Sequence, residues 1–260
     1  MEETSNEKES FPHYSLVIAA LAVIAAISSC GGSVNDVDKI KARGKLIMAT
    51  NASFPPFEFV DGSEYVGVDV DMAKEIAADL GVELEISDME FASIIGAVQS
   101  GKADLGIAGM SVNEERKQSV DFSIEYTKSQ LYILVKADNA DILGPDTLVN
   151  KTIAVQTGTT SDTFASDVEG ATMQRFSSFL DAAQAVKTGK ADAMVVDVLT
   201  AEAIIAENAD LKMLEEPLAD EGYAIAVAKG NQTLLDAVNA TLTRLIDEGK
   251  IEEFKTKYAG

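Results

Sequence analysis

Two charged side chains stand at the ends of predicted buried strands, where a small ligand could be held. Arg116 lies shortly after the apolar run Leu105–Ala108, and Asp197 directly follows the apolar run 193–196. A guanidinium beside a strand end can bind a carboxylate through two charge-assisted hydrogen bonds, and a carboxylate there can bind a cation. Position alone leaves two other interpretations open. Arg116 could pair with a neighbouring Glu on a solvated face, and Asp197 could be a plain helix cap.

A third group of polar residues follows the predicted strand 152–155, in the order Gln156-Thr157-Gly158-Thr159-Thr160-Ser161. A strand, a glycine turn and hydroxyls that open a helix are typical of a nest of backbone amides that favours anions. The segment is not a Walker loop, because the lysine and the full glycine spacing are missing.

The elements that position Arg116 and Asp197 come from a sequence unit that the chain uses twice. Residues 97–110 and 185–198 are identical at six of fourteen positions, all in a helix end, a Gly-Lys turn and a strand start. The first copy closes its strand with Gly109 and the second with Asp197. A repeated helix–turn–strand unit predicts two similar α/β lobes, although this connection is also common by chance.

Apolar periodicity predicts further alternation of strands and helices. We expect strands at 45–50, 83–86, 131–135 and 223–227. We expect helices at 36–44, from the segment 65–72 to Leu80, at 91–98, 141–149 and 179–188, from about 199, and at 234–246 and 251–258. Asn113 should cap a short helix that carries Arg116, and Asp69 or Asp71 should cap the helix that stops at Gly81. The predicted class is α/β, with two lobes joined by crossings near 127–133 and 219–225.

A proline loop after the first strand holds aromatic residues. Pro55 and Pro56 forbid regular structure there, and Asp61-Gly62 signals a hairpin turn. We expect Phe57 and Phe59 to pack in the core and Phe54, just past the strand end, to face a ligand.

Composition excludes several functional classes. The chain of 260 residues has a formal charge of −22, which argues against nucleic acid as a partner. Cys30 is the only cysteine, His13 the only histidine, and tryptophan is absent. Beyond residue 30 no thiol or imidazole remains, so we expect no metal and no cofactor, and an enzyme is disfavoured. Catalysis by carboxylate, Lys or Tyr stays open.

The N-terminus resembles a bacterial lipoprotein signal. Leu16–Ile27 is an apolar run too short for a comfortable membrane span, and Ile-Ser-Ser-Cys at 27–30 resembles a lipobox whose Cys30 is lipidated. A Gly-Gly-Ser tether follows. The acidic residues 1–15 do not fit the usual positive start of such a signal. A start codon placed too early or a tolerant export system would explain this.

The ordered set of motifs from residue 40 onward resembles the extracytoplasmic solute-binding proteins of family 3, which feed polar amino acids to ABC importers. The motifs are Phe54-Pro55-Pro56-Phe57-Glu58-Phe59, Gly67-Val68-Asp69-Val70-Asp71, Gly101-Lys102-Ala103-Asp104, Gly109-Met110-Ser111, Glu115-Arg116-Lys117, Val120-Asp121-Phe122-Ser123, Gln156-Thr157-Gly158-Thr159-Thr160, Asp192 through Asp197, and Gly222-Tyr223-Ala224-Ile225-Ala226-Val227.

The resemblance implies a bilobal periplasmic-binding-protein fold of type II with the ligand in the cleft. We expect a signal peptide with lipobox at 1–30, a tether at 31–44, lobe 1 at 45–128 plus 224–260, and lobe 2 at 129–223. The implied protein is an extracytoplasmic monomer, lipid-anchored to the bacterial membrane. Its partners are an amino acid and an ABC permease.

The resemblance also assigns roles to individual residues. Arg116 would hold the ligand's α-carboxylate, with Thr159 and Thr160 completing that site. Gly109 and Ser111 would hold the α-amino and carboxylate groups, and Asp197 would take the ammonium. The expected aromatic clamp around the ligand's side chain is Phe54 and Phe91. Asn51 and Gln156 would line the side-chain region.

The preferred amino acid stays open between a basic and a neutral polar one. Asn51 stands where the family often has an Asp that reaches a lysine- or arginine-like side chain, whereas Phe54 and Phe91 could still stack on a guanidinium. We expect binding with lobe closure and no enzymatic activity. The alternatives are an enzyme resembling cyclohexadienyl dehydratases, with Glu90 as its acid, and a ligand-sensing partner of a receptor.

Overall fold

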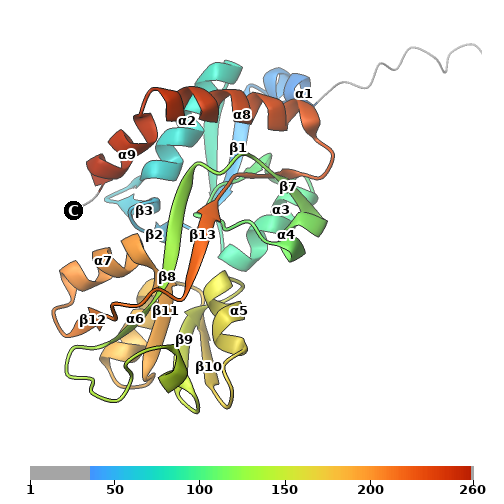
Figure 1. The fold of residues 1–260 in the computed structure, drawn as a ribbon. Helices are drawn as coiled ribbons and strands as arrows, with labels where there is room; N and C mark the ends of the chain where they lie inside the picture. Colours follow the sequence, from blue (N-terminus) through green and yellow to red (C-terminus); the bar gives the residue numbers. More distant parts are fainter. Residues whose placement is uncertain (1–35, 259–260) are drawn as a thin grey trace, which may run out of the picture. The chain divides into compact units, whose positions relative to one another are not determined.

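The structure of the protein, a computed structural model, describes residues 36–258. These residues belong to one compact unit, which contains two large β-sheets and one small sheet with helices packed around them (Figure 1). The expected signal peptide with Cys30 and residues 31–35 of the expected tether lie outside the described residues, whereas residues 36–43 of that tether form a helix. Within residues 36–258, no helix is long and apolar enough to span a membrane.

The first large sheet has the strand order β5-β1-β6-β14-β7. β1 is parallel to β5 and β6, whereas β14 is antiparallel to β6 and β7. The strand bounds are β1 Lys45–Thr50, β5 Glu83–Asp88, β6 Leu105–Gly106, β7 Val120–Phe122 and β14 Ala226–Ala228. The sheet is covered on both faces, because Leu46 and Met48 of β1 pack in one apolar cluster and Ala49 packs in another.

The second large sheet has the order β10-β9-β11-β8-β12, and β13 also pairs with β8. β9 is parallel to β10 and β11, and β8 is antiparallel to its neighbours. The bounds are β8 Thr127–Lys136, β9 Thr152–Gln156, β10 Thr172–Phe176, β11 Ala193–Asp197, β12 Leu211–Met213 and β13 Ala219–Tyr223. The short third sheet consists of β2 Ser53–Phe54, β3 Glu58–Asp61 and β4 Glu64–Val66, and the predicted hairpin at Asp61-Gly62 joins its last two strands.

Most predicted helices form close to their predicted bounds. The helices are α1 Asp36–Arg43, α2 Val68–Leu80, η2 Phe91–Ser93, α3 Ile94–Gln99, α4 Glu114–Ser119, η3 Pro145–Leu148, α5 Thr160–Ser166, α6 Phe179–Lys187, α7 Val198–Glu207, α8 Gln232–Asp247 and α9 Lys250–Tyr258. α2 buries Met72, Ile76 and Leu80, and it ends at Gly81, whose φ of 72° only glycine adopts readily.

Three local predictions are wrong. The helix expected at 141–149 is only the short turn η3, because Gly144 is extended and Pro145 starts the turn. The strand expected at 223–227 is two strands, β13 and β14, which belong to different sheets. Neither Asp69 nor Asp71 caps α2, since Gly67 occupies the N-cap position without a side-chain hydrogen bond.

The repeated unit is present in both sheets, and its aspartate makes the same hydrogen bond in each copy. In the first copy the Asp104 carboxylate accepts from the Ile47 amide of β1 at 2.7 Å. In the second copy the Asp192 carboxylate accepts from the Thr152 amide of β9, also at 2.7 Å. Each aspartate therefore ties its Gly-Lys turn to the neighbouring parallel strand, which explains why the repeat includes it.

The chain passes between the two large sheets twice. It leaves the first sheet after β7 and enters the second with β8, and it returns from β13 to β14. β8 and β13 pair antiparallel from Thr127↔Tyr223 to Leu131↔Ala219, so both crossings lie side by side (Figure 1). The exact lobe bounds given above stay a prediction.

Candidate ligand-binding site

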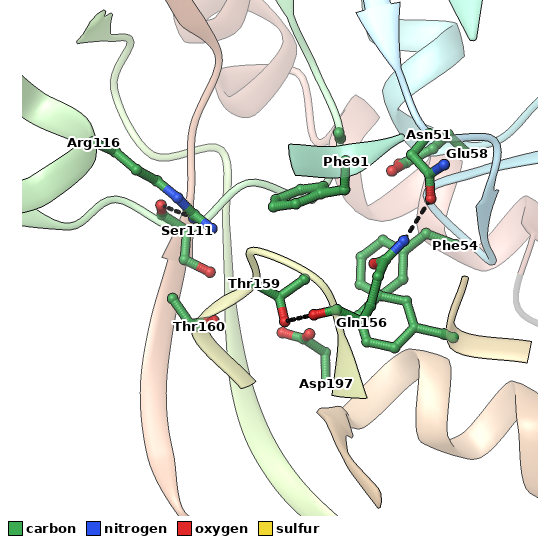
Figure 2. Close-up of a pocket in the computed structure, with 13 residues that line it drawn as sticks. Asn51, Phe54, Glu58, Phe91, Ser111, Arg116, Gln156, Thr159, Thr160 and Asp197 are labelled. Atoms are coloured by element: carbon green, nitrogen blue, oxygen red, sulfur yellow. Dashed lines mark hydrogen bonds between the residues drawn. The ribbon is translucent and has the colours of Figure 1, made fainter. Parts of the chain in front are cut away.

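The carboxyl ends of strands from both large sheets meet at one narrow cavity, in which the volume open to the centre of a water-sized sphere is only about 10 Å³. All ten predicted ligand-binding residues line it, together with three that sequence reasoning missed (Figure 2). The predicted residues are Asn51, Phe54, Phe91, Gly109, Ser111, Arg116, Gln156, Thr159, Thr160 and Asp197, and the three others are Glu58, Ala108 and Phe179. The structure brings these side chains together, and their roles toward a ligand stay predictions.

Arg116 is a buried cation whose partners are backbone carbonyls. Its short helix α4 begins as predicted, because the Asn113 side chain accepts from the Arg116 amide at 2.8 Å. The guanidinium is 8% exposed; Nη1 donates to the Ser111 carbonyl at 2.6 Å and Nη2 to the Gly158 carbonyl at 3.0 Å. No carboxylate within residues 36–258 lies close enough to form an ion pair with it. Arg116 therefore does not salt-bridge a neighbouring Glu on a solvated face.

The environment of Arg116 favours an anionic ligand. Burial lowers the pKa of the guanidinium, whereas the charge of the nearby Glu221 raises it in part. The guanidinium carbon lies 5.3 Å from the centre of the Phe91 ring. A buried cation that lacks a direct counterion is costly, so a ligand carboxylate would compensate it.

Asp197 is a buried carboxyl at the end of β11. Its Oδ1 accepts from the Tyr223 hydroxyl and from Ser129 Oγ, the latter at 3.2 Å. Burial, and then the nearby Glu221 carboxylate, raise the pKa of Asp197 to about 7. Asp197 does occupy the N-cap position of α7, but its side chain makes no capping hydrogen bond. A carboxyl with these surroundings would be stabilised in its charged form by a ligand cation.

The polar segment after β9 is largely occupied by its own hydrogen bonds. The Thr159 hydroxyl caps α5 by accepting from the Asp162 amide and donates to the Gln156 carbonyl at 2.9 Å. The Gly158 amide donates to the Asp162 carboxylate at 3.1 Å. The predicted nest therefore has one of its amides taken by a protein carboxylate.

Amide side chains link the two sheets at the other side of the cavity. Gln156 Nε2 donates to Asn51 Oδ1 at 2.7 Å and to the Ser177 carbonyl at 2.8 Å. Asn51 Nδ2 in turn donates to the Met89 carbonyl at 2.8 Å. The Phe54 ring stacks on Phe179 at 5.1 Å, which completes an apolar wall.

Glu58 is the most informative residue that sequence reasoning missed. It is 1% exposed, and neither of its oxygens has a hydrogen-bond donor among the described residues. Burial, and then the neighbouring Asp69 carboxyl, raise the pKa of Glu58 well above its usual value. Asp69 Oδ1 also lacks a donor, so a proton on Glu58 would supply one to Asp69.

Asp69 also fixes the backbone that reaches the cavity. Its Oδ2 accepts from the Gly109 amide at 2.8 Å and from the Tyr126 hydroxyl at 3.0 Å. Burial raises the pKa of Asp69 to about 6, although the hydrogen bonds from Gly109 and Tyr126 lower it in part. Gly109 has a φ of 50°, and a Cβ there would lie 2.3 Å from the Phe54 ring. Only glycine fits this position.

Away from the crossing strands β8 and β13, three direct hydrogen bonds within residues 36–258 join the loops of the first sheet to the elements of the second. They are Arg116 Nη2 to the Gly158 carbonyl, Gln156 Nε2 to Asn51 Oδ1, and Thr200 Oγ1 to the Pro55 carbonyl. The cavity is therefore enclosed by both sheets. In the part of the chain that the structure describes, no cluster of three or more His, Cys, Asp or Glu residues could hold a metal ion.

Known proteins share this sequence and architecture. The family model of the bacterial extracellular solute-binding proteins, family 3, matches residues 46–260. The arginine-binding extracellular protein ArtP of Bacillus subtilis is 33% identical over 249 residues, which cover 94% of this chain and 96% of that protein. A mutant of ArgBP from T. maritima has 44% identity and a TM-score of 0.83, covering 85% of this chain and 98% of that chain. The ancestral amino acid-binding protein AncCDT-1, a precursor of cyclohexadienyl dehydratase, has 37% identity and a TM-score of 0.81, covering 87% of this chain and 100% of that chain.

Proposed function

Because the chain belongs to the bacterial extracellular solute-binding proteins of family 3, we propose that it binds a basic L-amino acid, L-arginine first, and delivers it to an ABC importer. The ligand lies in the cavity between the two large sheets. Arg116 binds its α-carboxylate, and Asp197 binds its α-ammonium. These two contacts account for the groups that all α-amino acids share, and they select the class of ligand.

The single observation that carries the choice of a basic side chain is the buried carboxyl of Glu58. Figure 2 shows Arg116 and Ser111 on one side of the cavity and Asn51 and Glu58 on the other. A ligand whose α-groups lie at Arg116 would therefore extend its side chain toward Glu58. A guanidinium beside Glu58 would favour the ionised form of this carboxyl, whose pKa burial and Asp69 raise, and would then offer two parallel donors to its two oxygens.

Because of Glu58, the neutral Asn51 no longer argues against a basic ligand. Sequence comparison with the family placed a neutral residue, Asn51, where an acid often binds a basic side chain. In the structure Glu58 lines the same cavity, so an acid is present from a different position. Phe54 and Phe91 add aromatic surface that favours a planar cation.

The remaining parts of the proposal concern delivery. The family is extracellular, and lipidation at Cys30 would keep the protein at the outer face of the cell membrane. Residues 31–35 would then act as the tether between anchor and carrier, because α1 already packs into the carrier through the buried Ile40. Loss of membrane association after Cys30→Ala, measured by fractionation of cells, tests this part separately.

The test of the ligand compares L-arginine with L-citrulline, its neutral analogue of similar shape. Isothermal titration should give at least tenfold tighter binding of L-arginine to the wild-type protein, because only the guanidinium can pair with Glu58. Glu58→Gln should remove most of this preference. Glu90→Gln is the matched control, since Glu90 is exposed and does not line the cavity. Equal affinity for both ligands would contradict the assignment of a basic side chain.

A broader screen tests whether another amino acid binds more tightly than L-arginine. Residues 31–260 are heated with each of the twenty amino acids, and a tight ligand raises the unfolding midpoint by mass action. A neutral amino acid as the strongest hit would keep the carrier function and change its substrate. No response to any amino acid would overturn the proposed function.

The enzyme alternative now rests on Glu58 and no longer on Glu90. Glu90 is exposed and outside the cavity, whereas Glu58 is a buried carboxyl with a raised pKa, the property of a general acid. Incubation with arogenate or prephenate, followed by detection of an aromatic product, tests it. We expect no turnover, and turnover that Glu58→Gln abolishes would establish the enzyme instead.

A further inference from the structure

Glu221 is a carboxylate outside the cavity lining that is hydrogen-bonded to a residue inside it. It belongs to β13, the return crossing, and its carboxylate accepts the hydroxyl proton of Ser111. A second cavity, next to the first, contains Glu221 and shares Ser111 and Thr160 with it. Glu221 therefore touches the ligand site through Ser111.

The backbone fixes this contact. Ser111 forms an isolated antiparallel bridge with Tyr223. The Val112 amide donates to the Gly222 carbonyl at 3.1 Å, and the Ala224 amide donates to the Met110 carbonyl at 3.0 Å. These bonds align residues 110–112 with 222–224 and place Glu221 beside Ser111.

The side of β13 that carries Glu221 also supports Asp197. Glu221 pairs in register with Ser129 of β8, and Tyr223 follows two residues later, so these side chains share one face of the crossing strands. Ser129 and Tyr223 both donate to Asp197 Oδ1. One face of the crossing thus holds both acids near the α-group end of the cavity.

The hydrogen bond from Ser111 to Glu221 decides what Ser111 can offer a ligand. A hydroxyl has one proton, and Ser111 gives it to Glu221. The lone pairs of Ser111 Oγ then remain free to accept a hydrogen bond, and the ligand's ammonium group can donate one. A carboxylate ligand could gain no hydrogen bond from this hydroxyl unless the bond to Glu221 broke.

We propose that Glu221 is a positioning residue that selects for the ligand's α-ammonium group, by holding the Ser111 proton and by adding a second negative charge beside Asp197. This inference rests on the proposed amino-acid binding. It also revises the expectation that Ser111 serves the ligand's carboxylate, and it leaves that role to Arg116 and the threonines.

The experiment measures binding of L-arginine and of 5-guanidinopentanoate, which is the same molecule without the α-amino group. Glu221→Ala should weaken L-arginine binding by about tenfold to a hundredfold, the usual effect of losing a hydrogen bond to a charged group. The affinity for the des-amino analogue should stay within about twofold. Glu221→Gln keeps an acceptor for Ser111 without the charge, so it should fall between wild type and Glu221→Ala.

Asp220→Asn is the charge-matched control. Asp220 neighbours Glu221 on the same strand but lies on the opposite face, where it accepts from Gln130 Nε2 at 2.8 Å. This variant should bind both ligands like the wild type. Unfolding midpoints measured without ligand show that each variant is folded.

Three results would overturn the inference. Equal weakening of both ligands by Glu221→Ala would make Glu221 merely structural. Unchanged arginine binding would remove its role, and tighter binding would show that Glu221 competes with the ligand's carboxylate. If the wild-type protein binds no amino acid, the proposed function itself fails, which the first titration reveals before any variant is measured.

Discussion

Arg116 on α4 and Asp197 at the end of β11 are both buried in the wall of one cavity, and they do not form an ion pair with each other. Each has only neutral hydrogen-bond partners within residues 36–258. Opposite charges that are held apart in a low-dielectric site attract a molecule that carries both charges. An α-amino acid is such a molecule.

Removal of either charge should nearly abolish binding. Arg116→Ala or Asp197→Ala leaves one end of the zwitterion buried without a partner, which costs about 2–5 kcal/mol, or about thirtyfold to several-thousandfold in affinity. Isothermal titration measures the loss, and circular dichroism checks the fold. Lys39→Ala, at an exposed lysine of α1, serves as the control. Near-wild-type affinity in either variant would refute the assignment of these two residues.

Arg116→Lys should fail to restore binding. Arg116 donates in two directions at once, to the Ser111 carbonyl and to the Gly158 carbonyl. A lysine has one compact charged group and cannot reproduce this planar fork together with a ligand contact. Affinity of the Lys variant within threefold of wild type would show that charge alone matters there.

Ligand binding should release a proton at mildly acidic pH. The pKa of Asp197 is about 7 in the ligand-free protein, so at pH 6 most molecules carry a proton there, and an ammonium ligand would expel it. Affinity should therefore fall as the pH drops from 8 to 5. Calorimetry at pH 6 in two buffers of different ionisation enthalpy gives the number of protons released, and a value of zero would contradict the role of Asp197.

The stability of the ligand-free protein should change in the opposite sense. The pKa of Asp197 is raised from its ordinary value of 3.8 to about 7, so the folded state holds this proton more tightly than the unfolded chain does. Its contribution to stability is complete below about pH 4 and is lost as the pH rises through 7. From pH 4 to pH 8, the unfolding midpoint of the wild type should therefore fall relative to that of Asp197→Asn.

Gly109→Ala should damage both stability and binding, whereas Gly101→Ala should damage stability only slightly. Both glycines have positive φ, 50° and 70°, so both substitutions bring backbone strain of about 1–2 kcal/mol. Only at Gly109 would the new Cβ collide with Phe54, because nothing lies within 4 Å of the Cβ position at Gly101. Unfolding midpoints and arginine titrations of both variants test this, and equal effects would contradict it.

Thr200→Val should loosen the contact between the two sheets without touching the ligand. Thr200 is fully buried and lies outside the cavity lining, and its hydroxyl donates to the Pro55 carbonyl at 3.0 Å. Loss of one such bond is worth about 0.5–1.5 kcal/mol, so affinity should fall about twofold to twelvefold. Stopped-flow measurement should show a faster ligand off-rate. Thr233→Val, at an exposed threonine, should leave the off-rate unchanged.

Strand ends alone single out Arg116, Asp197, Phe54 and the segment 156–161, whereas the assignment of Asn51, Phe91, Gly109 and Ser111 to the site follows from the resemblance to family 3. Arg116 and Asp197 each follow an apolar run, and parallel strands bring such ends to one edge of a sheet. The repeated Gly-Lys turn then aligns residues 97–110 with residues 185–198, so that Gly109 corresponds to Asp197.

Glu58 and Glu221 could not be found in the same way. Glu58 lies between Phe57 and Phe59, where alternation predicted an outward-facing polar residue, but Glu58 is buried and Phe59 is only half-buried. Glu221 meets Ser111 through a bridge between segments about 110 residues apart. Both positions follow from tertiary contacts, which local patterns do not contain.

The Asp69 carboxyl connects the two ends of the cavity, since its Oδ2 accepts from the Gly109 amide and Asp69 also raises the pKa of the neighbouring Glu58. A change at position 58 that alters the preferred side chain therefore also disturbs the backbone beside the α-groups. We therefore expect a substitution at Glu58 alone to change the affinity for every amino acid as well as the preferred side chain. Positions 58 and 69 should instead change together, and libraries that vary both at once are the direct route to a redesigned carrier.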